Sequence, residues 1–261
     1  MKQREIHKFP LLSVSDVTVR FGGITALDKV SFEISKGSIC GLIGPNGAGK
    51  TTLFNCMSRI YDPDRGDIFF EGQSILSLPT YKMSSLGMGR TFQNLALFPT
   101  MSVLNNVMTG GHHYTKSDYL SNALGLSWAR KENRQAREAA MNLIDYLDLS
   151  PMMHSRVSTL PFGTQKRVEL ARALASRPKI LLLDEPAGGL NHDEIEELKE
   201  LILKIREKLN LTILLVEHHM NLVMQVSEQV AVLNFGKKIA DGTPTQIQRH
   251  PEVIEAYLGT G

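Results

Sequence analysis

Apolar and polar residues alternate along the first part of the chain. Over residues 14–32 the alternation continues on both sides of Phe21-Gly22-Gly23, which predicts short antiparallel strands joined by a turn. The apolar run at residues 38–43 predicts a buried strand, and a glycine-rich loop separates it from an expected helix over residues 50–58. A further strand is expected at residues 67–70. Strand, loop and helix in this order are the context in which phosphate-binding loops occur.

The middle of the chain, residues 94–159, has a helical and irregular texture. Within it, residues 128–147 are rich in Ala, Glu, Arg and Leu, and apolar side chains recur at helical spacing at Ala136, Ala140, Leu143, Ile144 and Leu147. We therefore expect a helical subdomain inserted into the chain.

Strands return in the last third of the chain. The apolar runs at residues 180–183 and 212–216 predict buried strands, and a helix is expected between them, from about residue 193 to residue 209. Residues 229–242 predict a hairpin that turns near residues 234–236. Because parallel strands here alternate with helices, the expected fold class is α/β.

Composition and charge narrow the class of protein. The chain has 261 residues, of which 42% are hydrophobic and 21% charged, as in an ordinary globular protein with one core and an embedded subdomain. The net charge of +2 argues against nucleic acid as a partner. No apolar run in the sequence approaches the roughly 20 residues of a membrane-spanning helix. Residues 1–10 precede an alternating stretch and not an apolar signal core, so we expect an uncleaved, cytosolic chain.

The glycine-rich loop gives the strongest chemical signal. Its sequence, which matches the phosphate-loop pattern, is Gly44-Pro45-Asn46-Gly47-Ala48-Gly49-Lys50-Thr51. Glycines let backbone N–H groups face phosphate oxygens that bulkier residues would exclude. We expect Lys50 to contact the β and γ phosphates, the Thr51 hydroxyl to hold Mg²⁺, and Thr52 with the helix N-terminus to face the remaining phosphate oxygens.

A pair of acids follows the apolar strand at residues 180–183, in the sequence Asp184-Glu185-Pro186. The carboxyl end of a parallel strand is the edge at which α/β folds bind ligands. We therefore expect Asp184 to reach Mg²⁺ through water, and Glu185 to orient and polarise an attacking water molecule. A strand that ends in two acids is by itself usually a solvated terminus, but the phosphate loop upstream favours the functional interpretation.

From Leu11 to Gly261 the chain resembles the ATPases of ABC transporters, because its motifs occur in that family's order. The resemblance implies an α/β fold with a P-loop NTPase core of the ABC ATPase type, an N-terminal antiparallel β subdomain and an inserted helical subdomain. It implies a single ABC ATPase domain over residues 1–261, with the nucleotide-binding core at about 11–93 and 165–261 and the helical subdomain at about 94–164. The implied cofactors are ATP and Mg²⁺.

The resemblance adds three residues to the expected site. Phe21 corresponds to the family's aromatic that stacks on adenine, although a core strand aromatic would also fit this position. Gln93, in Arg90-Thr91-Phe92-Gln93-Asn94, corresponds to the glutamine that senses Mg²⁺ and the attacking water. His218 corresponds to the histidine that contacts the γ-phosphate. Together with Glu185, Gln93 and His218 form the implied catalytic set, and Gln93 joins Thr51 and Asp184 at the implied metal.

The signature motif of the family departs from its usual sequence here. It normally reads Leu-Ser-Gly-Gly-Gln, whereas the matching residues are Leu160, Pro161, Phe162, Gly163 and Thr164, followed by Gln165. Gly163 and the dipole of the following helix are left to contact the ATP held by the opposite subunit. A simple helix start, with proline in a comfortable position, is the alternative interpretation. Whether the composite site formed by this motif hydrolyses ATP stays open.

Within the family, several stretches resemble the branched-chain amino-acid importers, among them residues 89–94, 97–99, 185–191, 216–218 and 256–259. Residues 112–131 resemble the longer of the two ATPases that those importers use. The resemblance implies an ATP-hydrolysing subunit, peripheral at the cytoplasmic face of the inner membrane, that powers the importer. The implied partners are membrane permease subunits, a second, different ATPase or a second copy of this chain, and indirectly a periplasmic binding protein.

Two alternatives belong to other functional classes. A soluble ABC ATPase acting in repair, translation or cofactor assembly would share the same motifs. A regulatory partner that hydrolyses ATP poorly is suggested by Pro161, which replaces the signature serine. Glu185 and His218 argue against complete loss of hydrolysis.

Overall fold

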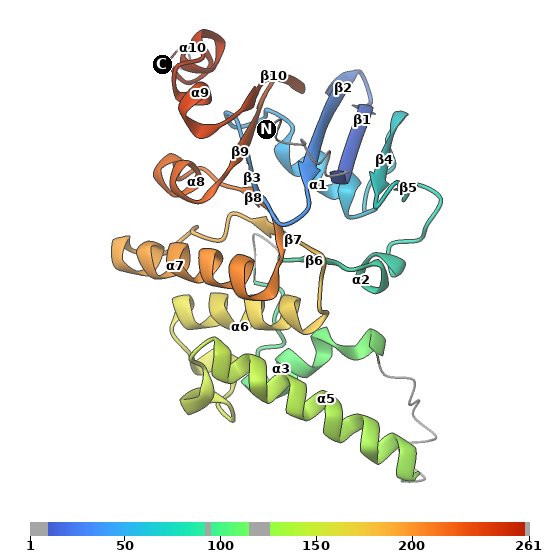
Figure 1. The fold of residues 1–261 in the computed structure, drawn as a ribbon, viewed down its shortest axis with the longest axis vertical. Helices are drawn as coiled ribbons and strands as arrows, with labels where there is room; N and C mark the ends of the chain where they lie inside the picture. The colour runs from blue at the N-terminus through green and yellow to red at the C-terminus, as the bar shows by residue number, and fades with distance from the viewer. Residues whose placement is uncertain (1–9, 92–94, 115–125, 259–261) are drawn as a thin grey trace, which may run out of the picture. The chain divides into compact units, whose positions relative to one another are not determined.

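The computed structural model describes residues 10–91, 95–114 and 126–258 (Figure 1). The chain divides into two compact units. Unit 1 consists of Met1–Thr80 with Ile195–Gly261, and unit 2 consists of Tyr81–Glu194. Unit 2 extends on both sides of the helical subdomain expected at residues 94–164, so the expected boundary between that subdomain and the nucleotide-binding core stays a prediction. None of the helices in the described ranges is long and apolar enough to cross a bilayer.

Unit 1 contains an antiparallel sheet with the strand order β2-β1-β4-β5. The chain turns between β1 and β2 at Gly22, whose φ of +58° lies in the left-handed region that glycine favours. The strands and the turn predicted over residues 14–32 are confirmed. The bounds of these strands are β1 (Pro10–Phe21), β2 (Ile24–Ser35), β4 (Arg65–Phe70) and β5 (Gln73–Ser74).

A second set of strands in unit 1 is mostly parallel. β3 pairs in parallel with both β8 and β9, while β9 and β10 form the predicted hairpin. Every residue of β3 and β8 is buried, as expected when both faces of a parallel strand are covered. The bounds are β3 (Ile39–Ile43), β8 (Thr212–Val216), β9 (Gln229–Asn234) and β10 (Lys237–Gly242).

The helices of unit 1 follow these strands along the chain. Those that lie wholly within unit 1, among the described residues, are α1 (Lys50–Met57), α8 (Met220–Val226), α9 (Pro244–Gln248) and α10 (Pro251–Leu258). α8 packs tightly on β3, since a Cβ added at Gly41 would lie 2.5 Å from Cγ1 of Val223. The hairpin and the last two helices complete the C-terminal part of the unit (Figure 1).

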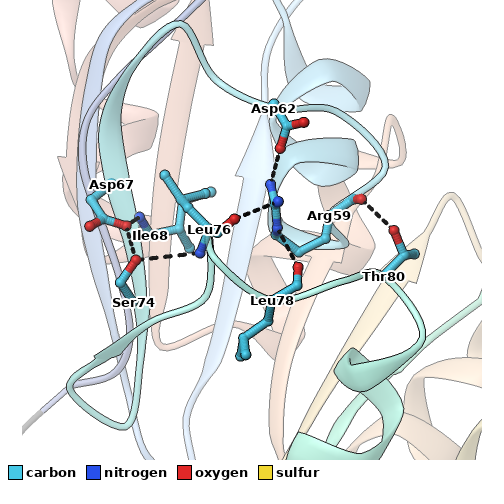
Figure 2. A network of polar contacts seen from close by, with 8 residues as sticks. All are labelled: Arg59, Asp62, Asp67, Ile68, Ser74, Leu76, Leu78 and Thr80. Atoms are coloured by element: carbon cyan, nitrogen blue, oxygen red, sulfur yellow. Dashed lines mark hydrogen bonds and ion pairs between the residues drawn. The ribbon is translucent and has the colours of Figure 1, made fainter.

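Arg59 fixes the loop that follows α1, as Figure 2 shows. Its guanidinium donates to the carbonyl oxygen of Leu76 at 2.6 Å and to that of Leu78 at 3.1 Å, and it also pairs with Asp62. The Thr80 hydroxyl donates to the carbonyl oxygen of Arg59 at 2.7 Å. Only 10% of the Arg59 side chain is exposed. Residues 76–80, the last segment of unit 1 before the chain enters unit 2, are therefore hydrogen-bonded to Arg59, which follows the C-terminal end of α1.

Unit 2 combines a short parallel strand pair with a group of packed helices. α3 packs against α5 and α6, and a Cβ added at Gly110 would lie 1.9 Å from the carbonyl oxygen of Arg172, so α3 and α6 approach closely. The buried Asn106 amide bonds to the Phe98 N–H at 2.8 Å and to the Phe98 carbonyl at 3.0 Å. The elements are α2 (Lys82–Leu86), β6 (Met88–Arg90), α3 (Val103–Gly110), η1 (His112–Tyr114), α5 (Ser127–Tyr146), η2 (Ser150–Met152), η3 (Val157–Thr159), α6 (Phe162–Ala175) and β7 (Ile180–Asp184).

The elements with strong periodicity lie where the sequence predicts them. The helix expected at residues 128–147 is α5, and the one expected at about 193–209 is α7 (His192–Leu209), which begins in unit 2 and continues in unit 1. The α/β fold class is confirmed by the parallel pairs β3–β8 and β6–β7. Short elements such as α2, β6 and α9 were not predicted, because a few residues do not establish a period.

Candidate functional site

The glycine-rich loop between β3 and α1 has a backbone that glycine alone accommodates. Gly44, Gly47 and Gly49 have φ of +153°, +77° and +100°, values that side chains with a Cβ rarely adopt. Space is also restricted, because a Cβ at Gly44 would lie 2.1 Å from the carbonyl oxygen of Leu233 and one at Gly49 would lie 2.7 Å from that of Ala26. The loop therefore packs closely against β9 and β2.

Lys50 is the first residue of α1 and is only 6% exposed. Its ammonium donates to the carbonyl oxygen of Gly44 at 2.7 Å and to that of Pro45 at 3.0 Å. The carbonyl of Ala48 accepts the N–H of Gly236 at 3.0 Å, which ties the loop to the β9–β10 turn. A fixed positive charge thus lies inside the curve of the loop, where it can pair with phosphate oxygens.

The start of α1 supplies further positive potential. Gly49 is the N-cap residue and has no side chain to bond the first-turn N–H groups, and no acid lies in that turn. Uncapped N–H groups and the helix dipole together make an anion site. Thr51 is exposed and Thr52 half-buried in this turn, so both hydroxyl-bearing residues lie at the same helix end.

Phe21 ends β1 on the surface of unit 1. Its side chain is 47% exposed, which rules out the alternative of a core strand aromatic, and its role toward adenine stays a prediction. The ring of Tyr61 meets it edge-on, with centroids 5.4 Å apart and planes at 72°. The Asp64 carboxylate accepts the N–H of Arg20 at 2.6 Å and holds the end of β1 beside the same loop. Tyr61 was not singled out from the sequence, because nothing local indicates which ring it meets.

His218 follows β8 and is exposed, and the residue before it fixes its backbone. The Glu217 carboxylate, 1% exposed, accepts the N–H of His218 at 2.9 Å and that of His219 at 3.2 Å. This arrangement stabilises the turn that presents the imidazole. The sequence alone left Glu217 without a role, and the structure shows that its carboxylate holds this turn.

Asp184 lies at the carboxyl end of β7 in unit 2 and is 4% exposed. Its carboxylate pairs with the Arg90 guanidinium at 3.2 Å, and its N–H donates to the Thr91 hydroxyl at 3.3 Å. Burial raises the pKa of the Asp184 carboxyl; Arg90 opposes that shift, the Glu185 charge adds to it and Lys166 opposes it. Carboxylates whose pKa is shifted by burial and by specific charged neighbours are concentrated at functional sites.

Glu185, the next residue, adopts a left-handed backbone with φ of +48°. Its carbonyl oxygen accepts the N–H of Gly188 at 3.1 Å and the Lys166 ammonium at 3.3 Å. Non-glycine residues in this conformation are uncommon and cluster at functional sites. The strain at Glu185 therefore agrees with a functional assignment, although the catalytic role of Glu185 stays a prediction.

The stretch expected to form the signature lies at the start of α6. Pro161 precedes the helix, and the described side chains provide no cap there. Gly163 faces Glu194, since an added Cβ would lie 2.5 Å from its Oε1. The Gln165 side-chain amide donates to the carbonyl oxygen of Leu160 at 2.9 Å. This amide is therefore hydrogen-bonded within the signature stretch itself.

Some of the predicted site residues thus belong to unit 1 and others to unit 2. Unit 1 contains Phe21, the glycine-rich loop with Thr51 and Thr52, and His218, whereas unit 2 contains Asp184, Glu185 and the signature stretch of residues 160–165. Gln93 lies outside the described residues, and its assignment stays a prediction.

Comparison with known proteins identifies related chains. A family model described as "ABC transporter" matches residues 27–188, and one described as "Branched-chain amino acid ATP-binding cassette transporter" matches residues 237–261. The high-affinity branched-chain amino acid transport ATP-binding proteins BraF of Pseudomonas aeruginosa and LivG of Escherichia coli are each 42% identical over 250 residues, covering 96% of this chain and 98% of theirs. A crystal structure of a nucleotide-free ATP-binding cassette from an ABC transporter is similar with a TM-score of 0.82 and 29% identity, covering 95% of this chain and 99% of that one.

Proposed function

The chain belongs to the ABC transporter family, and on that basis we propose that it binds and hydrolyses ATP to power a membrane importer of branched-chain amino acids. The observation that supports ATP binding most directly is the glycine-rich loop. Its left-handed glycines, the buried Lys50 ammonium and the uncapped start of α1 together suit a chain of phosphates.

Within unit 1, each group has a distinct task toward ATP. Backbone N–H groups of the loop and Lys50 bind the β and γ phosphates, and Phe21 offers a ring face to the adenine base. His218, held by Glu217, donates to the γ-phosphate oxygens. Because Lys50 and the loop backbone are already fixed, little reorganisation is required when ATP binds.

The residues present also suit a magnesium ion. The Thr51 hydroxyl and the Asp184 carboxylate provide the hard oxygen donors that Mg²⁺ prefers, with Gln93 as the third expected contact. When bound there, Mg²⁺ would neutralise negative charge on the phosphates. Arg90 orients the Asp184 carboxylate from the protein side.

Hydrolysis is assigned to Glu185. Its carboxylate orients and polarises a water molecule for in-line attack on the γ-phosphate, while Lys50 and His218 stabilise the charge that develops. The backbone strain at Glu185 and the two hydrogen bonds to its carbonyl support a fixed position for this carboxylate. The signature stretch at the start of α6 is expected to contact ATP bound by a second ATPase subunit.

We propose the transported substrate and the partner subunits from the similarity to the named relatives. BraF and LivG are named as transport ATP-binding proteins for branched-chain amino acids, and identity to them extends over nearly the whole chain. We expect membrane permease subunits as direct partners, together with a second ATPase or another copy of this chain, and a periplasmic binding protein that acts indirectly. The protein is then peripheral, at the cytoplasmic face of the inner membrane.

Glu185→Gln tests the assignment of the reaction. The variant should bind ATP with the affinity of the wild type, because the phosphate loop is unchanged, and should lose ATP hydrolysis at least about a hundredfold. ATP affinity is measured with a fluorescent analogue and hydrolysis by phosphate release. Hydrolysis unchanged in the variant would contradict the role of Glu185, and a wild type that binds ATP without hydrolysing it would favour the regulatory alternative.

A further inference from the structure

A row of contacts within unit 2 links the start of α6 to the end of β7. The Lys166 ammonium lies 5.5 Å from the centroid of the Phe162 ring, within the range of a cation–π interaction. The same ammonium donates to the carbonyl oxygen of Glu185 at 3.3 Å. Phe162 and Lys166 are four residues apart on α6, so they share one face of the helix. The contacts therefore run from Phe162 through Lys166 to Glu185.

The Phe162 ring is also held against the loop that follows Glu185. A Cβ added at Gly189 would lie 2.8 Å from Cε1 of Phe162, so the glycine permits the ring to approach this closely. Gly189 has φ of +81°, which further disfavours any other residue. The ring, although 45% exposed, thus lies against the Gly189 backbone and beside the Lys166 ammonium.

The backbone of Glu185 is the group that this arrangement holds. With φ of +48°, its conformation is unfavourable for a residue with a Cβ and persists only if the surroundings impose it. The bonds from Gly188 and Lys166 converge on its carbonyl oxygen and orient that peptide group. Because the rotamers open to a side chain depend on its backbone φ and ψ, the bonds that orient this peptide also restrict the Glu185 side chain.

We infer that Lys166 is a positioning residue for Glu185 and that Phe162 holds Lys166 in place, an inference that rests on the proposed function. Phe162 occupies a position where the family's usual motif has glycine, and the contacts give this ring a task that glycine could not perform. The signature stretch, expected to meet ATP on a second subunit, is then connected within one chain to the carboxylate that acts on its own ATP.

Lys166→Met tests the inference, because methionine keeps the apolar stem and removes the donor. We expect kcat for ATP hydrolysis to fall about tenfold or more, while KM and the ATP dissociation constant change less than about twofold, since only the water-orienting group is displaced. Lys166→Arg should restore most of the activity, because arginine donates a hydrogen bond and stacks on a ring. Lys131→Met, at an exposed lysine of α5, is the matched control and should leave kcat unchanged.

Phe162 provides an independent arm of the test. Phe162→Leu keeps apolar bulk without a ring face and should lower kcat, whereas Phe162→Tyr keeps a ring face beside Lys166 and should lower it less. If Phe162 acts through Lys166, the double variant Phe162→Leu, Lys166→Met should be no slower than Lys166→Met alone. Additive losses, or no rescue by Lys166→Arg, would overturn the inference.

The experiments distinguish failure of the inference from failure of the proposed function. If Glu185→Gln abolishes hydrolysis while Lys166→Met keeps the wild-type kcat, the positioning role fails and the proposed function stands. If Glu185→Gln hydrolyses ATP normally, the assignment of Glu185 fails, and with it the premise of the inference.

Discussion

The carboxylate of Glu217 accepts the backbone N–H of His218 at 2.9 Å from a side chain that is only 1% exposed. Because the same oxygen also accepts the N–H of His219 at 3.2 Å, one buried group sets the direction of the turn after β8. The exposed imidazole of His218 is thus presented by a residue that the solvent hardly reaches.

Glu217→Ala should therefore lower kcat for ATP hydrolysis about tenfold, because it leaves both N–H groups without this acceptor and releases the turn. Glu217→Gln keeps a carbonyl oxygen at the same place and should retain most of the activity. Steady-state kinetics that compare kcat of the two variants with that of the wild type test this prediction. Equal losses in both would mean that the charge of Glu217 matters and not its hydrogen bonds to the turn.

Gly44→Ala should abolish ATP binding and lower the free energy of unfolding by about 3 kcal/mol, because the new methyl group would meet the Leu233 carbonyl oxygen at 2.1 Å. Gly72→Ala is the control: Gly72 also has a positive φ, of +77°, but no atom lies within 4 Å of an added Cβ. That variant should lose only about 1 kcal/mol and bind ATP normally. Urea unfolding and ATP titration measure both effects, and similar losses in the two variants would refute the steric argument.

Arg59→Met removes the donor to the carbonyl oxygens of Leu76 and Leu78 shown in Figure 2. Since the side chain is mostly buried, the free energy of unfolding should fall by about 3 kcal/mol. Arg134→Met, at an exposed ion pair with Glu138, should change it by no more than about 0.5 kcal/mol. Chemical denaturation of both variants provides the comparison, and a loss at Arg59 as small as that at Arg134 would contradict the structural role.

Tyr257→Phe reports on the burial of α10. Burial raises the pKa of Tyr257 from 10.0 to about 12, and the Gly44 backbone lowers it in part. As the pH rises above 10, the unfolded chain releases this proton before the folded one, so the tyrosine contributes stability that is complete below pH 10 and is lost toward pH 12. Over that range the wild type should lose stability relative to Tyr257→Phe. A difference between the two proteins that does not depend on pH would contradict the burial of this hydroxyl.

Periodicity and motif spacing predict the elements that bear the chemistry. β3, α1 and β7 lie where the apolar runs place them, because long regular patterns and glycine-rich loops are local properties of the chain. Lys50 and Asp184 can be chosen from sequence for the same reason. For Phe21 the sequence predicts a position on a strand but not whether the ring is exposed, because its exposure depends on which residues pack nearby.

The remaining site features come from contacts between distant segments. The ring of Tyr61 meets Phe21 across 40 positions of sequence (61 − 21), and Lys166 reaches Glu185 across 19. The left-handed φ of Glu185 also has no sequence signal, because glutamate rarely adopts it without support. Such relationships depend on tertiary packing, which residue types and spacing along the chain do not specify.

The central claim is that ATP hydrolysis by this chain drives the uptake of branched-chain amino acids. The most direct measurement is uptake of labelled leucine by cells in which the native gene is replaced by the Glu185→Gln form, at matched protein levels and beside a wild-type control. The account predicts normal uptake with the wild type and its loss with the variant. Equal uptake in both strains would contradict it.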